Sequence, residues 1–186
     1  VIVKDLTGIY SLSPYTLEEV VSRDYLLKER PDVIVNLVDG TNIERNLYLT
    51  TQLREIGIPV VIALNMMDLV EKKGDKIDVA KLSAELGCEI VEISALKNKG
   101  IDQLMKKAID TAYGAKQADS TETFAADIEE AIAKVTDLLP KSVPVVQRRW
   151  YAVKLFEKDE KILEQVKLST DNKTVLDQIV AEAEEK

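Results

Sequence analysis

Three short motifs carry the side chains best placed to do chemistry: Asp5-Leu6-Thr7-Gly8, Asn65-Met66-Met67-Asp68 and Ser94-Ala95-Leu96. The first motif follows a β-branched run, "VIV". An aspartate at the end of a strand can hold a magnesium ion through a water molecule, and a glycine three residues later can bring its amide to a phosphate group. The first motif therefore predicts a loop that meets a phosphate-bound metal.

The second and third motifs suit the recognition of a base. Asp68 would present two acceptors to the two donors on the N1 and N2 edge of guanine, a donor pair that adenine lacks. Asn65 would brace the neighbouring loops and contact N7. Backbone amides of the third motif would contact O6, with Lys97 stacking beside the ring. Together these motifs predict a guanine site.

Each motif is weak when taken alone. An isolated N-x-x-D is usually a turn in which Asn and Asp bond their own backbone, and an isolated S-A-L usually means nothing. Here the three occur in order, each after a predicted strand and with a helix between each. Ligands bind at the carboxyl edge of open α/β sheets, so the joint arrangement favours a nucleotide site over three unrelated turns.

The elements that must position these motifs alternate between strand and helix. Apolar runs predict strands at 1–6, 32–40, 58–65 and 89–94, and helices are predicted at 16–30, 41–57, 79–87 and 100–114. Thr16 and Glu19 form a capping-box pattern, as Thr41 and Glu44 could. The alternation predicts an α/β fold with a mostly parallel sheet and flanking helices.

Beyond residue 115 the alternation stops. Residues 116–123 are predicted to be a polar linker, and apolar residues then recur at helical spacing through 124–186. The sequence therefore predicts two domains, an α/β domain over 1–115 and a small all-α helical domain over 124–186.

Composition excludes several classes of function. The net charge of −8 argues against a nucleic-acid-binding surface. The absence of histidine excludes Ser–His catalysis, and the single cysteine, Cys88, excludes an internal disulfide and a Cys-based zinc site. Cys88 is predicted to be a buried packing thiol.

The chain resembles the cytosolic domain of the bacterial ferrous iron transport protein B (FeoB) family. The similarity rests on "DLTGIYSLSPY", "RDYLL", "NLVDGTNIERNLYLTTQL", "ALNMMDL", "SALKNKGIDQL" and "YAVKLFEKD". It covers nearly the whole chain. The resemblance implies a P-loop GTPase-type fold followed by a helical domain, with GTP or GDP and Mg²⁺ as cofactors.

The resemblance also implies roles for individual residues. Nucleotide contacts are expected from Asp5, Gly8, Asn65, Met66, Asp68, Ser94, Ala95 and Leu96, with Asp5 holding Mg²⁺ through water. The second switch would include Thr7, Gly8, Ile9, Tyr10 and Ser11. Thr7 stands where the family usually has proline. Ile9 stands where many GTPases carry a glutamine that orients water, so slow intrinsic turnover is expected and no residue is assigned a catalytic role.

One expected part is missing from the sequence. None of the seven glycines belongs to a G-x-x-x-x-G-K-[ST] pattern. The phosphate-binding loop, the strand leading into it and the first switch are therefore expected to lie before Val1. Alone, the chain is expected to be inactive and to bind GTP weakly or not at all.

By resemblance, the parent protein is a GTPase that couples nucleotide state to Fe²⁺ uptake. Its partners would be guanine nucleotide and a membrane-embedded iron permease domain of the same polypeptide, at the cytoplasmic face of a bacterial cell membrane; a homo-oligomer is a further expectation, and nucleic acid is not. The alternatives are a non-catalytic guanine-nucleotide sensor, a partner-docking module, or a different bacterial GTPase. A dinucleotide-dependent oxidoreductase is the most distant alternative, because no G-x-G-x-x-G follows a predicted strand.

Overall fold

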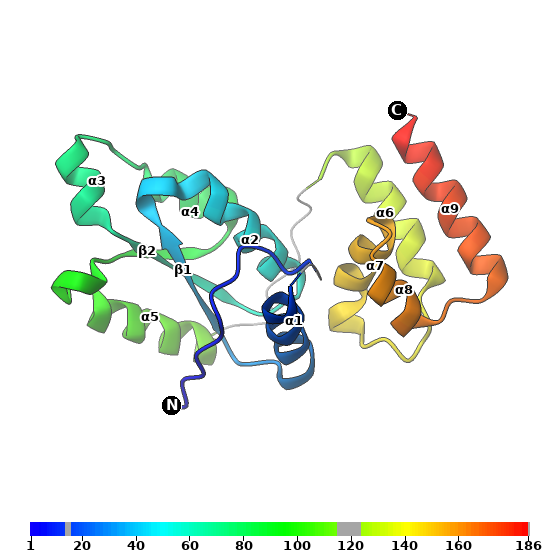
Figure 1. Cartoon of the computed structure of the whole chain (residues 1–186), viewed down its shortest axis with the longest axis horizontal. Coiled ribbons are helices and arrows are strands. Elements are labelled where there is room, and N and C mark those ends of the chain that lie inside the picture. The colour runs from blue at the N-terminus through cyan, green and yellow to red at the C-terminus, as the bar shows by residue number, and fades with distance from the viewer. Residues whose placement is uncertain (14–15, 115–123, 186) are drawn as a thin grey trace. The chain divides into compact units, whose positions relative to one another are not determined.

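The computed structural model describes residues 1–13, 16–114 and 124–185. Contacts between Cα atoms divide the chain into two compact units (Figure 1). The first consists of Val1–Arg54 and Ile58–Asp119, and the second of Glu55–Gly57 and Ser120–Lys186. The predicted linker, 116–123, lies outside the described residues.

A three-stranded parallel sheet forms the centre of the first unit. Its strands are β1 (Ile34–Asp39), β2 (Val60–Asn65) and β3 (Glu89–Glu92), in the spatial order β1-β2-β3. β2 lies between the other two and is buried along nearly its whole length. Its continuous apolar sequence is what a parallel strand covered on both faces requires.

The described residues of the first unit form these α-helices around the strands: α1 (Leu17–Glu29), α2 (Ile43–Glu55, whose last residue is assigned to the second unit), α3 (Met67–Lys73), α4 (Val79–Leu86) and α5 (Ile101–Gly114). The predicted capping box is present at α1, where Thr16 and Glu19 bond each other's backbone amide. At the other predicted box, a short 3-10 turn over Gly40–Asn42 precedes α2, and Asp39 rather than Thr41 supplies its cap. The predicted helices are thus present, with α3 in addition.

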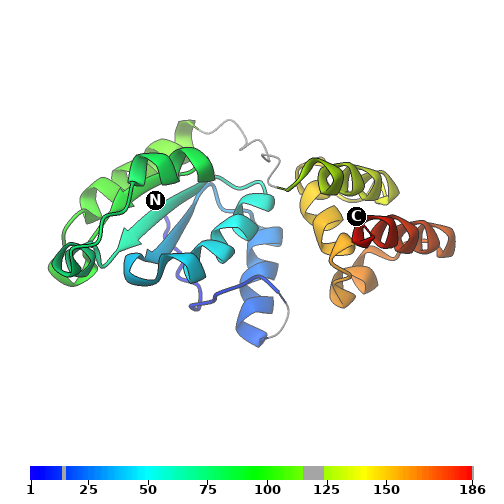
Figure 2. The same cartoon turned by 90° about the horizontal axis from the view of Figure 1, so that it is seen from above.

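Helices cover both faces of the sheet (Figure 2). On one face, Leu104 of α5 packs with Val61, Ala63 and Val91 in a buried cluster. On the other face, Asn36 of β1 donates to the hydroxyl of Thr50 of α2 at 2.7 Å. The βα alternation of the sequence therefore produces the predicted layered α/β arrangement.

The outer edge of β1 has no strand beside it among the described residues. Side chains alternate along this strand: Asn36 and Val38 are buried, whereas Val35 and Leu37 are 43% and 59% exposed. By register, Val35 and Leu37 share the face of Val61 and Ala63, on which α5 packs mainly against β2 and β3. Among the described residues, this face of β1 is therefore only partly covered, although burying such a side chain contributes roughly 1.5–3 kcal/mol.

The predicted strand over residues 1–6 is wrong. Residues 1–9 have no regular secondary structure; Val1 and Ile2 are almost fully exposed, and Val3 is 74% exposed. A β-branched run prefers a pleated, half-buried surface and forms a strand only beside a hydrogen-bonding neighbour. None of the described strands pairs with this segment.

The second unit is helical, as predicted. Its α-helices are α6 (Ala126–Leu138), α7 (Arg148–Phe156), α8 (Glu160–Val166) and α9 (Thr170–Glu184). Its core contains the fully buried side chains of Trp150, Val135, Leu155 and Ile162. The rings of Trp150 and Tyr151 pack edge to face, with their centroids 5.1 Å apart. Residues 124–185 contain no strand.

Arg149 forms a buried ion-pair cluster in the second unit. Its guanidinium binds both carboxylate oxygens of Glu129, at 2.7 and 2.8 Å, and one oxygen of Glu55 at 2.7 Å. These hydrogen bonds, led by those to Glu129, raise the pKa of Arg149. We refer to Arg149, Glu129 and Glu55 as the arginine cluster.

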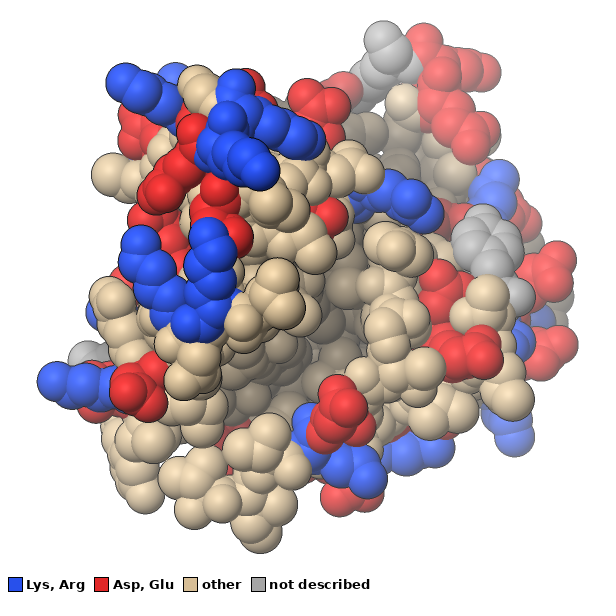
Figure 3. Space-filling view, turned by 60° about the vertical axis from the view of Figure 1, so that its left-hand side comes forward, with Lys and Arg blue, Asp and Glu red and all other residues tan. Residues whose placement is uncertain are grey.

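Charged side chains of both signs are mixed over the face of the molecule in Figure 3. That face has no continuous basic surface of the kind nucleic-acid binding needs. Cys88 is buried, as predicted, and burial raises the pKa of its thiol.

Candidate functional site

The motif Asn65-Met66-Met67-Asp68 lies where β2 ends and α3 begins. Asn65 is the last residue of the strand, Met66 takes a left-handed conformation (φ 62°), and Asp68 lies in the first helical turn. This sharp turn brings the Asn65 and Asp68 side chains to the carboxyl edge of the sheet, as the sequence predicts for ligand-binding residues.

The β1 loop approaches this turn closely. A side chain at Gly40 would place a Cβ only 2.9 Å from the carbonyl oxygen of Asn65. Only glycine allows that approach without movement of the backbone. The sequence Asp39-Gly40 therefore packs the end of β1 against the end of β2.

The motif Ser94-Ala95-Leu96 forms a closed loop after β3. Ser94 and Lys99 exchange two backbone hydrogen bonds, at 3.1 and 3.0 Å, around a 3-10 turn over Ala95–Lys97. Ser94 is buried, whereas Leu96 is 95% exposed and contributes no packing to the loop. The loop is therefore held by its backbone.

Side chains join these two loops. The Oδ1 atom of Asn65 accepts a hydrogen bond from the Ala95 amide at 3.0 Å, so Asn65 does brace the neighbouring loop. The Asp68 carboxylate lies 2.9 Å from the Lys97 ammonium. Hydrogen bonds from Lys97 and then Ser94 lower the pKa of Asp68. We refer to Asn65, Asp68, Ser94, Ala95 and Lys97 as the loop cluster.

The loop cluster offers a carboxylate in a fixed position. Asp68 is held from the side of Ser94, which is buried, and its side chain is 18% exposed. Two carboxylate oxygens at this edge can accept from a pair of parallel donors. Lys97 pairs with Asp68 in this structure, and its stacking beside a bound base stays a prediction. The position of Lys97 directly after Ser94-Ala95-Leu96 indicates from the sequence that this lysine lies near the predicted guanine site.

The first motif is not joined to the loop cluster in this structure. Asp5 and Gly8 are exposed, and no hydrogen bond or ion pair of the described residues links either to Asn65 or Asp68. Asp5 offers a single carboxylate, and the described residues hold no group of three His, Cys, Asp or Glu side chains that could bind a metal. A magnesium ion does not fit the described residues without further ligands.

The predicted second switch is anchored to α2 at two places. The ring of Tyr10 lies 4.1 Å from the guanidinium carbon of Arg45. The amide of Leu12, which is fully buried, donates to Oε1 of Gln52 at 2.7 Å. Thr7 and Gly8 precede these anchors in the exposed segment, with Ile9 partly buried and Ser11 capping the amide of Ser13.

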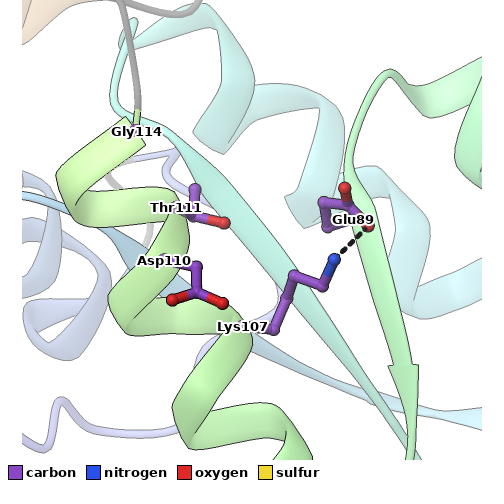
Figure 4. A pocket seen from close by; sticks show the side chains of 5 residues that line it. All are labelled: Glu89, Lys107, Asp110, Thr111 and Gly114. Atoms are coloured by element: carbon purple, nitrogen blue, oxygen red, sulfur yellow. Dashed lines mark ion pairs between the residues drawn. The ribbon is translucent and has the colours of Figure 1, made fainter.

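A depression of about 320 Å³ lies elsewhere, along α5 (Figure 4). Glu89, Lys107, Asp110, Thr111 and Gly114 line it, with an ion pair of 3.3 Å between Lys107 and Glu89. Glu89 is the first residue of β3, so this depression lies toward the amino end of the strand. It is separate from the loop cluster, which lies at the carboxyl ends.

Family comparisons agree with this arrangement of fold and site. A model of the ferrous iron transport protein B N-terminal family matches residues 1–108, and a model of the FeoB cytosolic helical domain matches residues 124–186. The chain belongs to the ferrous iron transport protein B family. The first matched region is the α/β unit of this chain, and the second is its helical unit.

Individual FeoB proteins resemble the chain over most of its length. The Fe(2+) transporter FeoB of Escherichia coli (strain K12) is 38% identical over 159 residues, which cover 83% of this chain and 20% of the relative. The chain thus spans about one fifth of the length of the curated relatives that it matches.

Solved FeoB structures share the fold. S. thermophilus NFeoB bound to GDP.AlF4- and K+ has a TM-score of 0.91 at 48% identity, and the match covers 97% of this chain and 70% of that one. An mGDP-bound mutant of the same protein has a TM-score of 0.92 at 48% identity, with the same coverage. The described helices of this chain include none long and apolar enough to cross a membrane.

Proposed function

We propose that this chain is the guanine-nucleotide-binding regulatory segment of a bacterial Fe²⁺ transporter. The observation that carries the proposal is the loop cluster: Asn65, Asp68, Ser94 and Ala95 converge from the carboxyl ends of two adjacent parallel strands. Membership of the FeoB family and the nucleotides named for the S. thermophilus structures support it.

Asp68 selects the base in this proposal. Its two oxygens accept the N1 and N2 donors of guanine, and adenine would leave the charged acceptor without those partners. A lost hydrogen bond to a charge corresponds to roughly a ten- to hundredfold preference. Asn65 keeps Ala95 in place through its hydrogen bond. The amides of Ala95 and Leu96 then contact the guanine O6, and Met66 and Ser94 lie beside the base.

The phosphate end requires residues outside the described ones. The free edge of β1 and its uncovered residues, Val35 and Leu37, fit a further parallel strand with a helix above it. We propose that such a strand leads into the phosphate-binding loop and lies beside the Val1–Asp5 segment. Asp5 would then hold Mg²⁺ through water, and Gly8 would contact the terminal phosphate.

The domain organisation follows the same proposal. A G domain over 1–115, without its first strand, phosphate-binding loop and first switch, is joined by a linker over 116–123 to a helical domain over 124–186. The second switch, Thr7 to Ser11, responds to the nucleotide through its contacts with α2. The helical domain passes that response to a membrane-embedded iron permease of the same polypeptide.

The parent protein would hydrolyse GTP at the cytoplasmic face of the membrane. Transition-state-analogue complexes of the S. thermophilus protein, named for GDP.AlF4-, support hydrolysis in the family. Ile9 cannot orient a water molecule, so turnover is slow without a partner or backbone groups. Self-association into a homo-oligomer is part of the same proposal, and the mass of the parent protein in solution tests it.

Competition binding to the full-length protein tests the base assignment. The wild type should prefer GTP to ATP, and Asp68→Asn should shift the preference to XTP, because the O2 of xanthine accepts a hydrogen bond from the new amide. Equal affinity of the wild type for ATP and GTP would contradict the assignment. Phosphate release by the same protein separates a GTPase from a nucleotide sensor that does not hydrolyse.

Residues 1–186 alone should bind a fluorescent GTP analogue more weakly than micromolar. The base would be held by Asp68 and Ser94, but the phosphates would lack a lysine and an amide nest. Tight, magnesium-dependent binding by this chain would show that the described residues already contain a phosphate site.

A further inference from the structure

The acceptor that would read guanine is already occupied by a side chain of the same protein. The Nζ atom of Lys97 lies 2.9 Å from Oδ2 of Asp68. Ser94, which is buried, also lowers the pKa of this carboxylate. An ammonium group is a donor, as are the N1 and N2 groups of guanine, so both seek the same oxygens.

The backbone keeps Lys97 within reach of Asp68. The double hydrogen bond between Ser94 and Lys99 closes the turn that carries Lys97, and the Asn65–Ala95 hydrogen bond attaches that turn to the Asp68 loop. Because the partners are already adjacent, their pairing requires little ordering of the chain. The Lys97 side chain is nevertheless 60% exposed, so it can leave Asp68 for water.

We propose that Lys97 is an intramolecular competitor for the base site, which it occupies when no nucleotide is present. This inference rests on the proposed function, in which Asp68 reads guanine. An entering base breaks the Lys97–Asp68 pair and takes over its oxygens. Lys97 therefore lowers the rate of nucleotide association and keeps the Asp68 carboxylate oriented.

The size of the effect follows from the exposure of the pair. Exposed ion pairs between lysine and carboxylate are weak, and their loss changes an equilibrium or rate by roughly two- to fivefold. The effect should shrink with ionic strength, because at about 1 M salt the Debye length is only about 3 Å.

Stopped-flow association of an N-methylanthraniloyl GDP with the full-length protein tests the proposal. Lys97→Met keeps the aliphatic stem that can lie against the base but removes the charge. Lys99→Met is the matched control: it removes the same charge from the same loop, and the side chain of Lys99 is exposed. At low salt, Lys97→Met should associate roughly two- to fivefold faster than Lys99→Met, and this difference should disappear near 1 M salt.

Two other results would contradict the role of Lys97 as a competitor, and they differ in what they mean for the proposed function. If Lys97→Met and Lys99→Met associate at the same rate while the wild type still prefers GTP to ATP, Lys97 is not a competitor and the proposed function stands. If the wild type binds GTP and ATP equally, Asp68 does not read guanine, and the proposed function fails together with the role of Lys97.

Discussion

The loop cluster and the arginine cluster each pair a cationic side chain with carboxylate, but in opposite settings. In the loop cluster, one lysine that is 60% exposed makes a single contact with Asp68. In the arginine cluster, Arg149 binds Glu129 through two parallel bonds and Glu55 through a third, and the two carboxylate side chains are only 11% and 8% exposed. The planar guanidinium suits such bidentate bonding, whereas the ammonium of lysine is a compact, strongly hydrated charge.

Burial decides what each cluster can do. Removing one partner from a buried ion pair leaves an uncompensated charge in a low-dielectric surrounding, so the intact pair is difficult to open. An exposed pair exchanges its partner for water at little cost. The arginine cluster therefore acts as a permanent support of the second unit, and the loop cluster can change partners when a ligand arrives.

The largest expected effect comes from breaking the arginine cluster. Arg149→Met should lower the free energy of unfolding of the second unit by about 3 kcal/mol, because the buried carboxylates of Glu129 and Glu55 would lose the hydrogen bonds from its guanidinium. Urea unfolding followed by the fluorescence of Trp150, the single tryptophan, measures this change.

Lys134→Met in α6 is the matched control for this prediction. It breaks an exposed ion pair with Glu130 in the same unit and removes the same charge. Its urea midpoint should equal that of the wild type within error. A midpoint for Arg149→Met that also equals the wild type would show that the arginine cluster contributes no support.

A smaller and local effect is expected from Asn65→Ala. The Ala95 amide would lose its acceptor, a hydrogen bond worth about 1 kcal/mol, which corresponds to roughly fivefold faster hydrogen exchange at that amide. The Val91 amide, within β3, should keep its protection in the same sample. Unchanged exchange at Ala95 would show that Asn65 does not hold the loop.

The sequence predicted what depends on local pattern. The apolar runs of β1, β2 and β3 and the helices between them are readable from periodicity, and the order of the motifs predicted that Asn65, Asp68 and Ser94 meet at one edge. The helical spacing after residue 124 likewise predicted the second unit.

The sequence could not predict what depends on distant neighbours. Val1–Val3 have the residue types of a strand, but a strand also needs a partner, and none of the described strands pairs with them. The arginine cluster joins residues 20 and 94 positions apart, and no spacing rule indicates such a contact. The pairing of Lys97 with Asp68 rather than with a base depends on which partner is present, which a sequence does not encode.

The smallest expected effect is on the stability of the first unit, and its pH dependence has a defined sign. The folded pKa of Asp68 lies below its unfolded value, chiefly because Lys97 donates to the charged form. The pair therefore contributes stability at pH values above the ordinary aspartate pKa of about 3.9. That contribution is lost as the pH falls through the lowered folded pKa.

Carbon-detected NMR titration of the Asp68 carboxyl group in residues 1–186 measures this pair without any nucleotide. Lys97→Met should move the midpoint of the Asp68 titration upward, toward that of an ordinary aspartate, and Lys99→Met should leave it in place. At neutral pH, Lys97→Met should lower the urea midpoint of the first unit only slightly, because an exposed ion pair contributes little stability. A large loss of stability would mean that Lys97 is a structural support like Arg149, and the difference between the two clusters would disappear. An unmoved midpoint for Asp68 would mean that the pair does not form in solution, and the competitor would have no site to occupy.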